Sequence, residues 1–376
     1  MRPIRIISHF ILDYLHTHKV LLIALLVALF TMLLVPIDRH YIEYFDFRTL
    51  TCLFCTSLVI SGFKNICIFE ILARKIVEKV STLRTGMLCV VFITFIGSMI
   101  LANDMALLTF LPLGYFVLKS SGNEKHMAFL FIMQNIAANL GGMLTPFGNP
   151  QNLYLFSYYQ IPTLEFMEIM FPPFITATTL IIILCLLQSK APLHLVESKE
   201  YPIDIKKTIL YTLLFIVSIL VVFRVFPYYW GLIAITLAMF ILDPKAFIGV
   251  DYALLLTFCF FFIFAGNMAR IPLVNEVVSK LISINPLWIG VASCQVMSNV
   301  PSSILLSKFT TNYPALLVAV NIGGCGTLIA SLASLITFSN YKQFDAKGTG
   351  KYLLQFSLYN FSFLIILLIL ETFLLF

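Results

Sequence analysis

Asp104 is the residue whose type and position point most directly to chemistry. Of the 18 Asp and Glu residues, it alone lies well inside an apolar region rather than near its boundary. A buried carboxylate without a partner is unfavourable unless it takes up a proton or binds a cation. We therefore predict that Asp104 is a proton acceptor or a cation ligand. The structural alternative is that it caps a short helix beginning at Met105.

Two further polar positions interrupt apolar sequence, one in each half of the chain. Asn103 precedes Asp104, and Ser298-Asn299 stands in the second half. Their side-chain oxygens, with backbone carbonyls at the tip of a helical hairpin, are suitable ligands for a hard cation such as Na+. Asn and Ser also favour turns for local reasons. Because each position precedes an interrupted apolar segment in its own half, we interpret the two together as an ion site.

Two apolar segments are interrupted by residues that a continuous helix tolerates poorly. The first, Asn135 to Phe156, carries closely spaced glycines and prolines. The second, Asn321 to Phe338, aligns with Asn139 to Phe156 without gaps. Identical residues pair Asn139 with Asn321, Gly141 with Gly323, Gly142 with Gly324, Thr145 with Thr327, Leu153 with Leu335 and Phe156 with Phe338. Such a recurring interruption in a membrane protein indicates a transporter binding site.

The interrupted segments could hold an anion without any Lys or Arg. Their glycines allow close approach of the backbone, and half-helix N-termini provide free N–H groups with about half a positive charge. Neutral polar side chains accompany them: Thr145, Asn149 and Asn152 in the first segment, and Thr327, Ser331 and Ser334 in the second. Glycines in membrane helices also serve tight packing, but packing does not explain why Pro146 and Pro150 flank Gly148-Asn149.

Composition places these segments in an all-α, polytopic membrane protein. The chain is 60% hydrophobic and 11% charged, with 36 Phe residues, which is far from the composition of a soluble domain. The net charge of +6 does not indicate nucleic-acid binding, because the basic residues are scattered over short loops. Cys52 and Cys55 lack a second pair or a His cluster, so we expect them to pack rather than to bind a metal.

The order of apolar runs predicts two repeats. Residues 1–190 form the first, with a re-entrant hairpin at 86–118 and a broken transmembrane helix at 127–158. Residues 191–207 form a cytoplasmic linker. Residues 208–376 form the second repeat, with a hairpin at 286–309 and a broken helix at 314–338. We expect the hairpin arms to be too short to cross a membrane, because a spanning helix needs about 20 residues.

Positive charge predicts the orientation of the chain. The first long apolar run, Val20 to Val35, lacks a cleavage site after it, so we expect a retained first helix and a multi-pass protein of the plasma membrane. With a cytoplasmic N-terminus and hairpins that re-enter on their own sides, most of the 24 Lys and Arg residues face inward. The outward ones are Arg39, Arg48, Arg224, Arg270, Lys280 and Lys308. In this arrangement the two repeats are inverted relative to each other.

Four motifs together resemble the ion transporter superfamily. They are LANDMALLTFLPL from Leu101, GGMLTPFGNPQN from Gly141, SNVP from Ser298 and NIGGCGTLIASLASL from Asn321. That superfamily contains divalent-anion/sodium symporters, citrate permeases, arsenite efflux permeases and NhaD-type sodium/proton antiporters. The resemblance implies an inverted-repeat fold with a scaffold and a transport domain, commonly a homodimer that moves substrate by an elevator motion.

The resemblance also bears on individual residues. In the dicarboxylate branch each hairpin tip has the sequence Ser-Asn-Thr. Of these residues this chain keeps only Asn103 in the first tip and Ser298 and Asn299 in the second. The second broken segment and the Asn-Val-Pro sequence of the second tip look closer to the arsenite and antiporter branches. We predict that the coupling ion is bound by Asn103, Asp104, Gly148, Ser298, Asn299 and Gly326. We predict that the substrate contacts Asn103, Gly142, Thr145, Pro146, Asn149, Asn152, Ser298, Thr327, Ser331 and Ser334.

The sequence therefore predicts a secondary active transporter for a small anion, either dicarboxylate- or citrate-like or an inorganic oxyanion, coupled to Na+ or H+. Arsenite-type efflux or Na+/H+ antiport is the alternative within the family, and a non-transporting membrane receptor is the alternative outside it. We do not expect an enzyme, because no nucleophile–base pair or metal cluster is visible at membrane depth. Apart from the coupling ion we expect no cofactor or metal, and the expected partners are the anion, the bilayer and a second copy, not nucleic acid.

Overall fold

The chain folds almost entirely into helices. The computed structural model describes residues 19–192 and 202–375. Within those ranges the β-structure is one isolated bridge between Thr82 and Pro192. The helices are α2 (Lys19–Leu34), α3 (His40–Glu43), α4 (Phe47–Asn65), α5 (Ile68–Val77), α6 (Leu83–Leu101), α7 (Asn103–Ser120), η1 (Glu124–His126), α8 (Met127–Gly141), η2 (Gly142–Leu144), α9 (Pro150–Tyr158), α10 (Thr163–Leu186), α11 (Ile205–Val222), α12 (Tyr228–Leu242), η3 (Pro244–Gly249), α13 (Tyr252–Arg270), α14 (Pro272–Ile284), α15 (Pro286–Met297), α16 (Asn299–Leu306), α17 (Tyr313–Ile322), η4 (Leu328–Ala330), α18 (Leu332–Phe344) and α19 (Thr349–Leu375).

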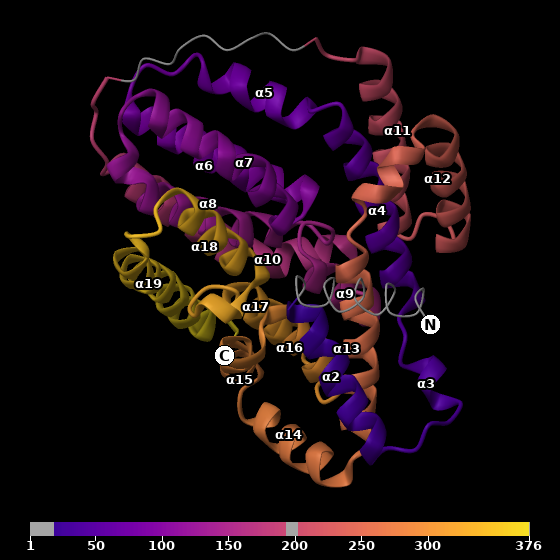
Figure 1. Ribbon diagram of the computed structural model, residues 1–376. Helices are drawn as coiled ribbons and strands as arrows, with labels where there is room; N and C mark the ends of the chain where they lie inside the picture. The colour runs from indigo at the N-terminus through magenta and orange to yellow at the C-terminus, as the bar shows by residue number, and fades with distance from the viewer. Residues whose placement is uncertain (1–18, 193–201, 376) are drawn as a thin grey trace, which may run out of the picture.

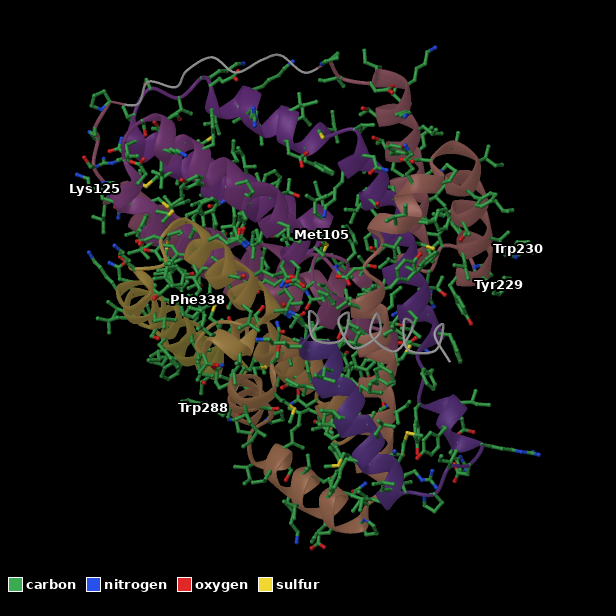
Figure 2. The ribbon with its side chains drawn as sticks, viewed as in Figure 1. Met105, Lys125, Tyr229, Trp230, Trp288 and Phe338 are labelled. Atoms are coloured by element: carbon green, nitrogen blue, oxygen red, sulfur yellow. The ribbon has the colours of Figure 1, made fainter. Side chains whose placement is uncertain are left out.

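The helices are those of a multi-pass membrane protein. Within the described ranges, six are long and apolar enough to cross a membrane, and a seventh span results if α4 and α5, which meet at 61°, count as one. Their outer faces are apolar: Leu354 and Phe373 of α19 are 74% and 82% exposed. Tyr229 and Trp230 point away from α12 (Figure 2), as interfacial aromatic side chains do. The prediction of an all-α, polytopic membrane protein is confirmed.

Two pairs of consecutive helices turn at a single residue with a positive φ. α6 and α7 join at Ala102 (φ +65°), and α15 and α16 join at Ser298 (φ +76°). These joints coincide with the predicted hairpin tips. The arms differ in length, since α15 has 12 residues and α16 has 8, whereas α6 has 19. α6 is thus long enough to cross a membrane, unlike the short arm expected, because it begins at Leu83 behind a Thr82 cap rather than at residue 86.

The helix breaks occur where the glycines and prolines predicted them. α8 ends at Gly141, η2 follows, and α9 begins at Pro150, a residue with no N–H that suits the first helical position. In the second half, α17 ends at Ile322 and α18 begins at Leu332. α18 continues to Phe344, beyond the predicted end at residue 338. Part of the predicted linker, residues 193–201, lies outside the described residues, and the division into two inverted repeats stays a prediction.

α2 and α13 form a tightly packed pair although they are far apart in sequence (Figure 1). Asn267 of α13 donates a buried hydrogen bond to Thr31 Oγ1 of α2 at 3.2 Å. At the end of α13, Arg270 forms an ion pair of 2.6 Å with Asp38. An ion pair this exposed adds little to stability, so the apolar contact between the two helices holds the pair together. Arg270 does hold the pKa of Asp38 below its usual value by hydrogen bonding.

The interrupted segments meet at the centre of the molecule. α18 packs against α7 and α8, and α16 packs against α9, so each half contacts the other through its broken helix (Figure 1). α8 is almost wholly buried, including Gln134, Asn135 and Asn139. These amides are polar groups in the most enclosed helix of the protein. Their hydrogen bonds must therefore be formed within the protein.

Replacing Gly141 tests the close approach of α8 and α6. A Cβ at this position would lie 2.5 Å from the carbonyl oxygen of Phe95 and 2.7 Å from Ser98 Oγ. We expect Gly141→Ala to lower the free energy of unfolding by about 1–3 kcal/mol, because backbone atoms must move to admit the methyl group. The midpoint of thermal unfolding in detergent measures the effect.

The matched control is Gly350→Ala in the first turn of α19, where a Cβ meets nothing within 4 Å. It should leave the midpoint unchanged or raise it slightly, because Ala favours a helix more than Gly does. Equal midpoints for the two variants would contradict the tight contact between α8 and α6.

Candidate functional site

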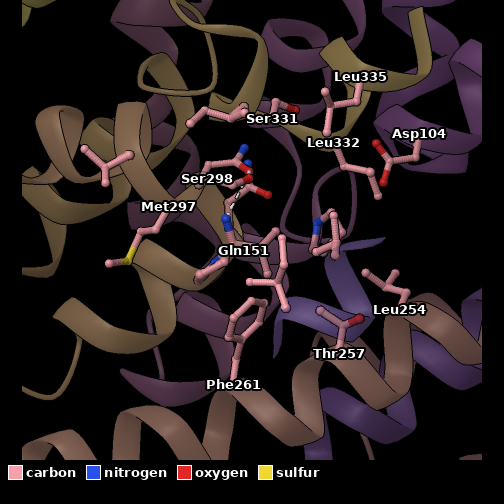
Figure 3. A pocket seen from close by; sticks show the side chains of 18 of the residues that line it. Asp104, Gln151, Leu254, Thr257, Phe261, Met297, Ser298, Ser331, Leu332 and Leu335 are labelled. Carbon is pink, nitrogen blue, oxygen red and sulfur yellow. Dashed lines mark hydrogen bonds between the residues drawn. The ribbon is translucent and has the colours of Figure 1, made fainter. Parts of the chain in front are cut away.

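A cavity of about 350 Å³ lies where the two hairpin tips meet the beginnings of α9 and α18. α2 and α13 form its other wall (Figure 3). Most of its lining is apolar. The polar residues that line it are Asn103, Asp104, Gln151, Thr257, Ser298, Asn299 and Ser331. Five of the predicted site residues, namely Asn103, Asp104, Ser298, Asn299 and Ser331, are therefore brought together at this cavity.

The two hairpin tips have the same local structure. Asn103 Oδ1 accepts a hydrogen bond from the N–H of Asp104 at 2.9 Å, and Asn299 Oδ1 accepts one from the N–H of Val300 at 2.9 Å. In both tips the preceding residue, Ala102 or Ser298, has a positive φ. The asparagine side chains thus fix the first turn of α7 and of α16.

Asp104 lies within the first turn of its helix and faces the cavity. α7 begins at Asn103 with Ala102 as its N-cap, so the alternative in which Asp104 caps a helix starting at Met105 is wrong. A carboxylate in a first helical turn still benefits from the helix dipole. Its Oδ1 atom is buried and finds no hydrogen-bond partner among the described residues. In Figure 3 the carboxyl group lies near Leu332 and Leu335 of α18.

In the described parts of the chain, this carboxylate forms no ion pair. None of the three ion pairs found in the described parts of the chain involves Asp104. Lys64 comes near the same hairpin, but its Nζ contacts Met105 Sδ at 3.3 Å. Within residues 19–192 and 202–375, no Lys, Arg or His lines the cavity. Asp104 is therefore the one formal charge on the described lining.

Behind the cavity, Asn139 of α8 joins the two halves. Its Oδ1 accepts hydrogen bonds from Asn103 Nδ2 at 3.1 Å and from Ser331 Oγ at 2.9 Å. Asn103 belongs to the first hairpin tip, whereas Ser331 is the N-cap of α18 in the second half. One buried amide thus couples a hairpin tip to the opposite broken helix.

Asn321 of α17 makes the reciprocal connection. Its Nδ2 donates to Asn152 Oδ1 at 2.6 Å and its Oδ1 accepts from Asn149 Nδ2 at 3.2 Å. Both partners are fully buried residues at the start of α9. Asn149 and Asn152, predicted to contact substrate, therefore support the site from behind. Asn139 and Asn321 were not predicted as site residues, although they are the first identical pair of the two aligned segments.

Threonines tie each break to the hairpin of its own half. Thr145 donates to the carbonyl of Met99 at 3.0 Å, and Thr327 donates to the carbonyl of Gln295 at 3.2 Å. Gln295 also donates to the carbonyl of Gly323 at 2.9 Å and accepts from the N–H of Thr327 at 2.8 Å. These contacts hold the unwound backbone at a fixed distance from each hairpin arm.

The other predicted residues also lie outside the cavity lining. Gly148 lies against the backbone of Gly142. A Cβ on either glycine would collide with the backbone of the other. Gly326 has φ +113° and packs against the Gln295 side chain. The predicted residues that do not line the cavity are Gly142, Thr145, Pro146, Gly148, Asn149, Asn152, Gly326, Thr327 and Ser334.

Two buried polar side chains were not among the predicted site residues. Gln151 is 1% exposed and lines the cavity, yet its Oε1 has no hydrogen-bond partner in the described part of the chain. Leaving such a group unpaired costs about 1–3 kcal/mol. Glu371 of α19 is also 1% exposed with an unpaired Oε1. Glu371 was not recognised because it stands near the end of an apolar run. The signal for Gln151 was its position in the amide-rich motif after Pro150.

Interrupted helices, two hairpin tips and one central cavity in a multi-pass protein define a membrane transporter. The chain belongs to the citrate transporter family, whose family profile matches residues 8–318. It is 34% identical over 306 residues to an uncharacterized transporter of Methanocaldococcus jannaschii, covering 79% of this chain and 81% of that protein. It is 29% identical over 299 residues to the inner membrane protein YbiR of Escherichia coli, covering 77% and 79%. The predicted relationship to the ion transporter superfamily is confirmed.

Replacing Asn321 tests the reciprocal amide contacts. Asn321→Leu keeps the size of the side chain but leaves Asn149 and Asn152 without their partner. We expect the free energy of unfolding to fall by about 1–3 kcal/mol, because buried amides lose hydrogen bonds. Thermal unfolding of the purified protein measures the change.

Gln343→Leu provides the control, because Gln343 is exposed on α18 and its side chain forms no hydrogen bond with the described residues. It should unfold at the wild-type midpoint. A wild-type midpoint for Asn321→Leu would show that the amide contacts do not stabilise the fold.

Proposed function

We propose that the protein is a secondary active transporter that moves a small anion across the membrane, coupled to Na+ or H+. The observation that carries this proposal is the meeting of both hairpin tips with the N-termini of two broken helices at one cavity. Membership of the citrate transporter family supports transport. The anion would be dicarboxylate- or citrate-like, or an inorganic oxyanion.

Asp104 is the proposed site of ion coupling. Its unpaired carboxylate oxygen is available to take a proton or to bind Na+. Ser298 Oγ lies on the other tip of the same cavity, and Asn103 and Asn299 hold the two tips in shape. We propose that Gly148 and Gly326 contribute by letting the backbone of each break approach its neighbours.

The proposed anion site is built from helix N-termini rather than from basic side chains. Pro150 at the start of α9 and Leu332 at the start of α18 both line the cavity. Each helix start carries about half a positive charge. Ser331 lines the cavity directly, while Asn149, Asn152 and Thr327 position the two breaks. In this proposal Gly142, Thr145, Pro146 and Ser334 act through the shape of the breaks.

We further propose that the two halves are inverted repeats and that the transport domain moves as an elevator. Matching contacts support the repeat: positive φ at both tips, and a threonine of each break bonded to the carbonyl of a hairpin arm. The α2–α13 pair would belong to the scaffold, facing the tips across the cavity. A homodimer in the plasma membrane with a cytoplasmic N-terminus is part of the same proposal.

One observation favours a second candidate function within the family. The one formally charged residue on the described cavity lining is Asp104, a carboxylate. A carboxylate is compatible with Na+/H+ antiport or with efflux of a neutral arsenite species, as well as with anion transport. In the antiport mechanism Asp104 alone would carry the transported ions. A receptor that binds without transport differs from both because it moves nothing across the membrane.

Flux into proteoliposomes distinguishes these functions. Purified protein should take up at least one of citrate, C4-dicarboxylates, sulfate, phosphate or arsenite under an imposed Na+ or H+ gradient, compared with empty vesicles. Na+/H+ exchange without anion flux would replace the symport proposal by antiport. Ligand binding with no flux under any gradient would support the receptor.

Asp104→Asn tests the coupling residue. The amide keeps the shape of the carboxyl group but neither ionises nor carries the transported proton. We expect gradient-driven flux to fall by about tenfold or more, with loss of its dependence on pH or Na+ and an unchanged unfolding midpoint. The control is Glu276→Gln on the exposed face of α14, where Glu276 pairs with Lys280. Wild-type pH and Na+ dependence in Asp104→Asn would remove Asp104 from the mechanism.

A further inference from the structure

The charge on the cavity lining limits the charge of the cargo. The starts of α9 and α18 together offset about one negative charge, and no Lys, Arg or His of the described ranges lines the cavity. Asp104 adds a negative charge unless it holds a proton or a cation. A dianion or trianion in this cavity would leave negative charge unbalanced. A singly charged anion, entering with H+ or Na+ on Asp104, is balanced.

The apolar wall limits the shape of the cargo. Leu254, Phe261 and Phe264 of α13 face the cavity, and Val20 and Val27 of α2 lie beside them. A fully hydrated inorganic oxyanion gains nothing from such a wall and loses water against it. An organic acid with an apolar portion buries that portion on α2 and α13 while its acidic group stays near the helix starts.

Gln151 lines the cavity with a side-chain amide that is not used by the protein itself. It is the second residue of α9, it is 1% exposed, and neither Oε1 nor Nε2 of its side chain forms a hydrogen bond with the described residues. Figure 3 shows it with Ser298 and Phe261, which line the same cavity. Most other polar side chains of the lining already bond to the protein, including Asn103, Ser331 and Thr257.

The second half has no equivalent of Gln151. In the gapless alignment of the two broken segments, its counterpart is Ala333, which is buried at the start of α18. Leu332 and Leu335 of the same helix line the cavity. Apart from its N-cap Ser331, α18 thus contributes apolar side chains to the cavity, whereas α9 contributes the amide of Gln151.

We propose that the cargo is a singly charged organic acid with an apolar portion, and that Gln151 is the residue that determines this specificity by hydrogen bonding to its acidic group. The inference rests on the proposed transport function and narrows its substrate class. The Nε2 group of Gln151 donates to the carboxylate oxygens, and the apolar portion lies against α2 and α13.

Calorimetric titration of the full-length protein in detergent tests the proposal, at one fixed pH and Na+ concentration. The probes are pentanoate and benzoate, compared with acetate, citrate and sulfate. We expect pentanoate or benzoate to bind at least about tenfold more tightly than the other three. Tighter binding of citrate or sulfate, or failure of both pentanoate and benzoate to bind, would overturn the proposal.

Variants at Gln151 test its role. Gln151→Ala should weaken binding of the preferred probe about fivefold or more, because one hydrogen bond is lost. Gln151→Glu, which keeps the shape and adds a negative charge, should weaken it further. Gln343→Ala, an exposed position on α18, is the matched control and should bind as wild type. Wild-type affinity in folded Gln151→Ala or Gln151→Glu would contradict the assigned role.

The unfolding midpoint without probe identifies any variant that fails to fold, in which case the other Gln151 variant decides. The binding test is independent of flux. Gradient-driven uptake of citrate without binding of pentanoate or benzoate would reject this inference and keep the transporter. Binding of pentanoate or benzoate without any gradient-driven flux would reject transport and leave the binding specificity in place.

Discussion

The structure depends on one constraint, which is that backbone and side-chain polar groups at membrane depth must find partners inside the protein. Two helices are interrupted near the centre of the molecule, and each interruption frees N–H and carbonyl groups. Asn149, Asn152 and Gln295 donate to backbone carbonyls of the breaks, and Asn321 in turn holds Asn149 and Asn152 in place. Irregular backbone can persist at this depth only because these amides surround it, so the cavity exists because the amide network does.

The network also explains why the hairpin tips and the breaks behave as one unit. Each hairpin arm accepts a hydrogen bond from the threonine of its own break, and each tip is held by its own asparagine. A shift of one tip must therefore move the adjoining break. α2 and α13 contribute mostly apolar side chains to the opposite wall. Most polar contacts therefore lie on the side of the tips and breaks, and the apolar wall lies on the side of α2 and α13.

Much of this organisation could be predicted from the sequence because it follows from local chemistry. Glycines and prolines end helices wherever they stand, so the break before Pro150 was visible, and Asn-Asp in apolar sequence marked the first tip. The partners across the molecule could not be predicted. Asn149 and Asn152 face away from the cavity because Asn321, far along the chain, accepts and donates to them, whereas Gln151 between them faces the cavity. A short helix with polar residues at successive positions does not reveal which of them meets a ligand, and a break does not reveal how far the following helix runs.

The contact between Asn139 and Ser331 has a consequence for biosynthesis. The two residues are 192 positions apart in the chain, and ribosomes add about 5–20 residues each second. Asn139 therefore enters the membrane about 10–40 s before its partner has been made. During that interval Asn139 has Asn103 of the first half as a partner, but its contact with Ser331 and that of Asn135 with Ser334 cannot yet form. The first broken helix therefore enters the membrane with only part of its hydrogen bonds made, which makes the order of synthesis part of how this protein reaches its fold.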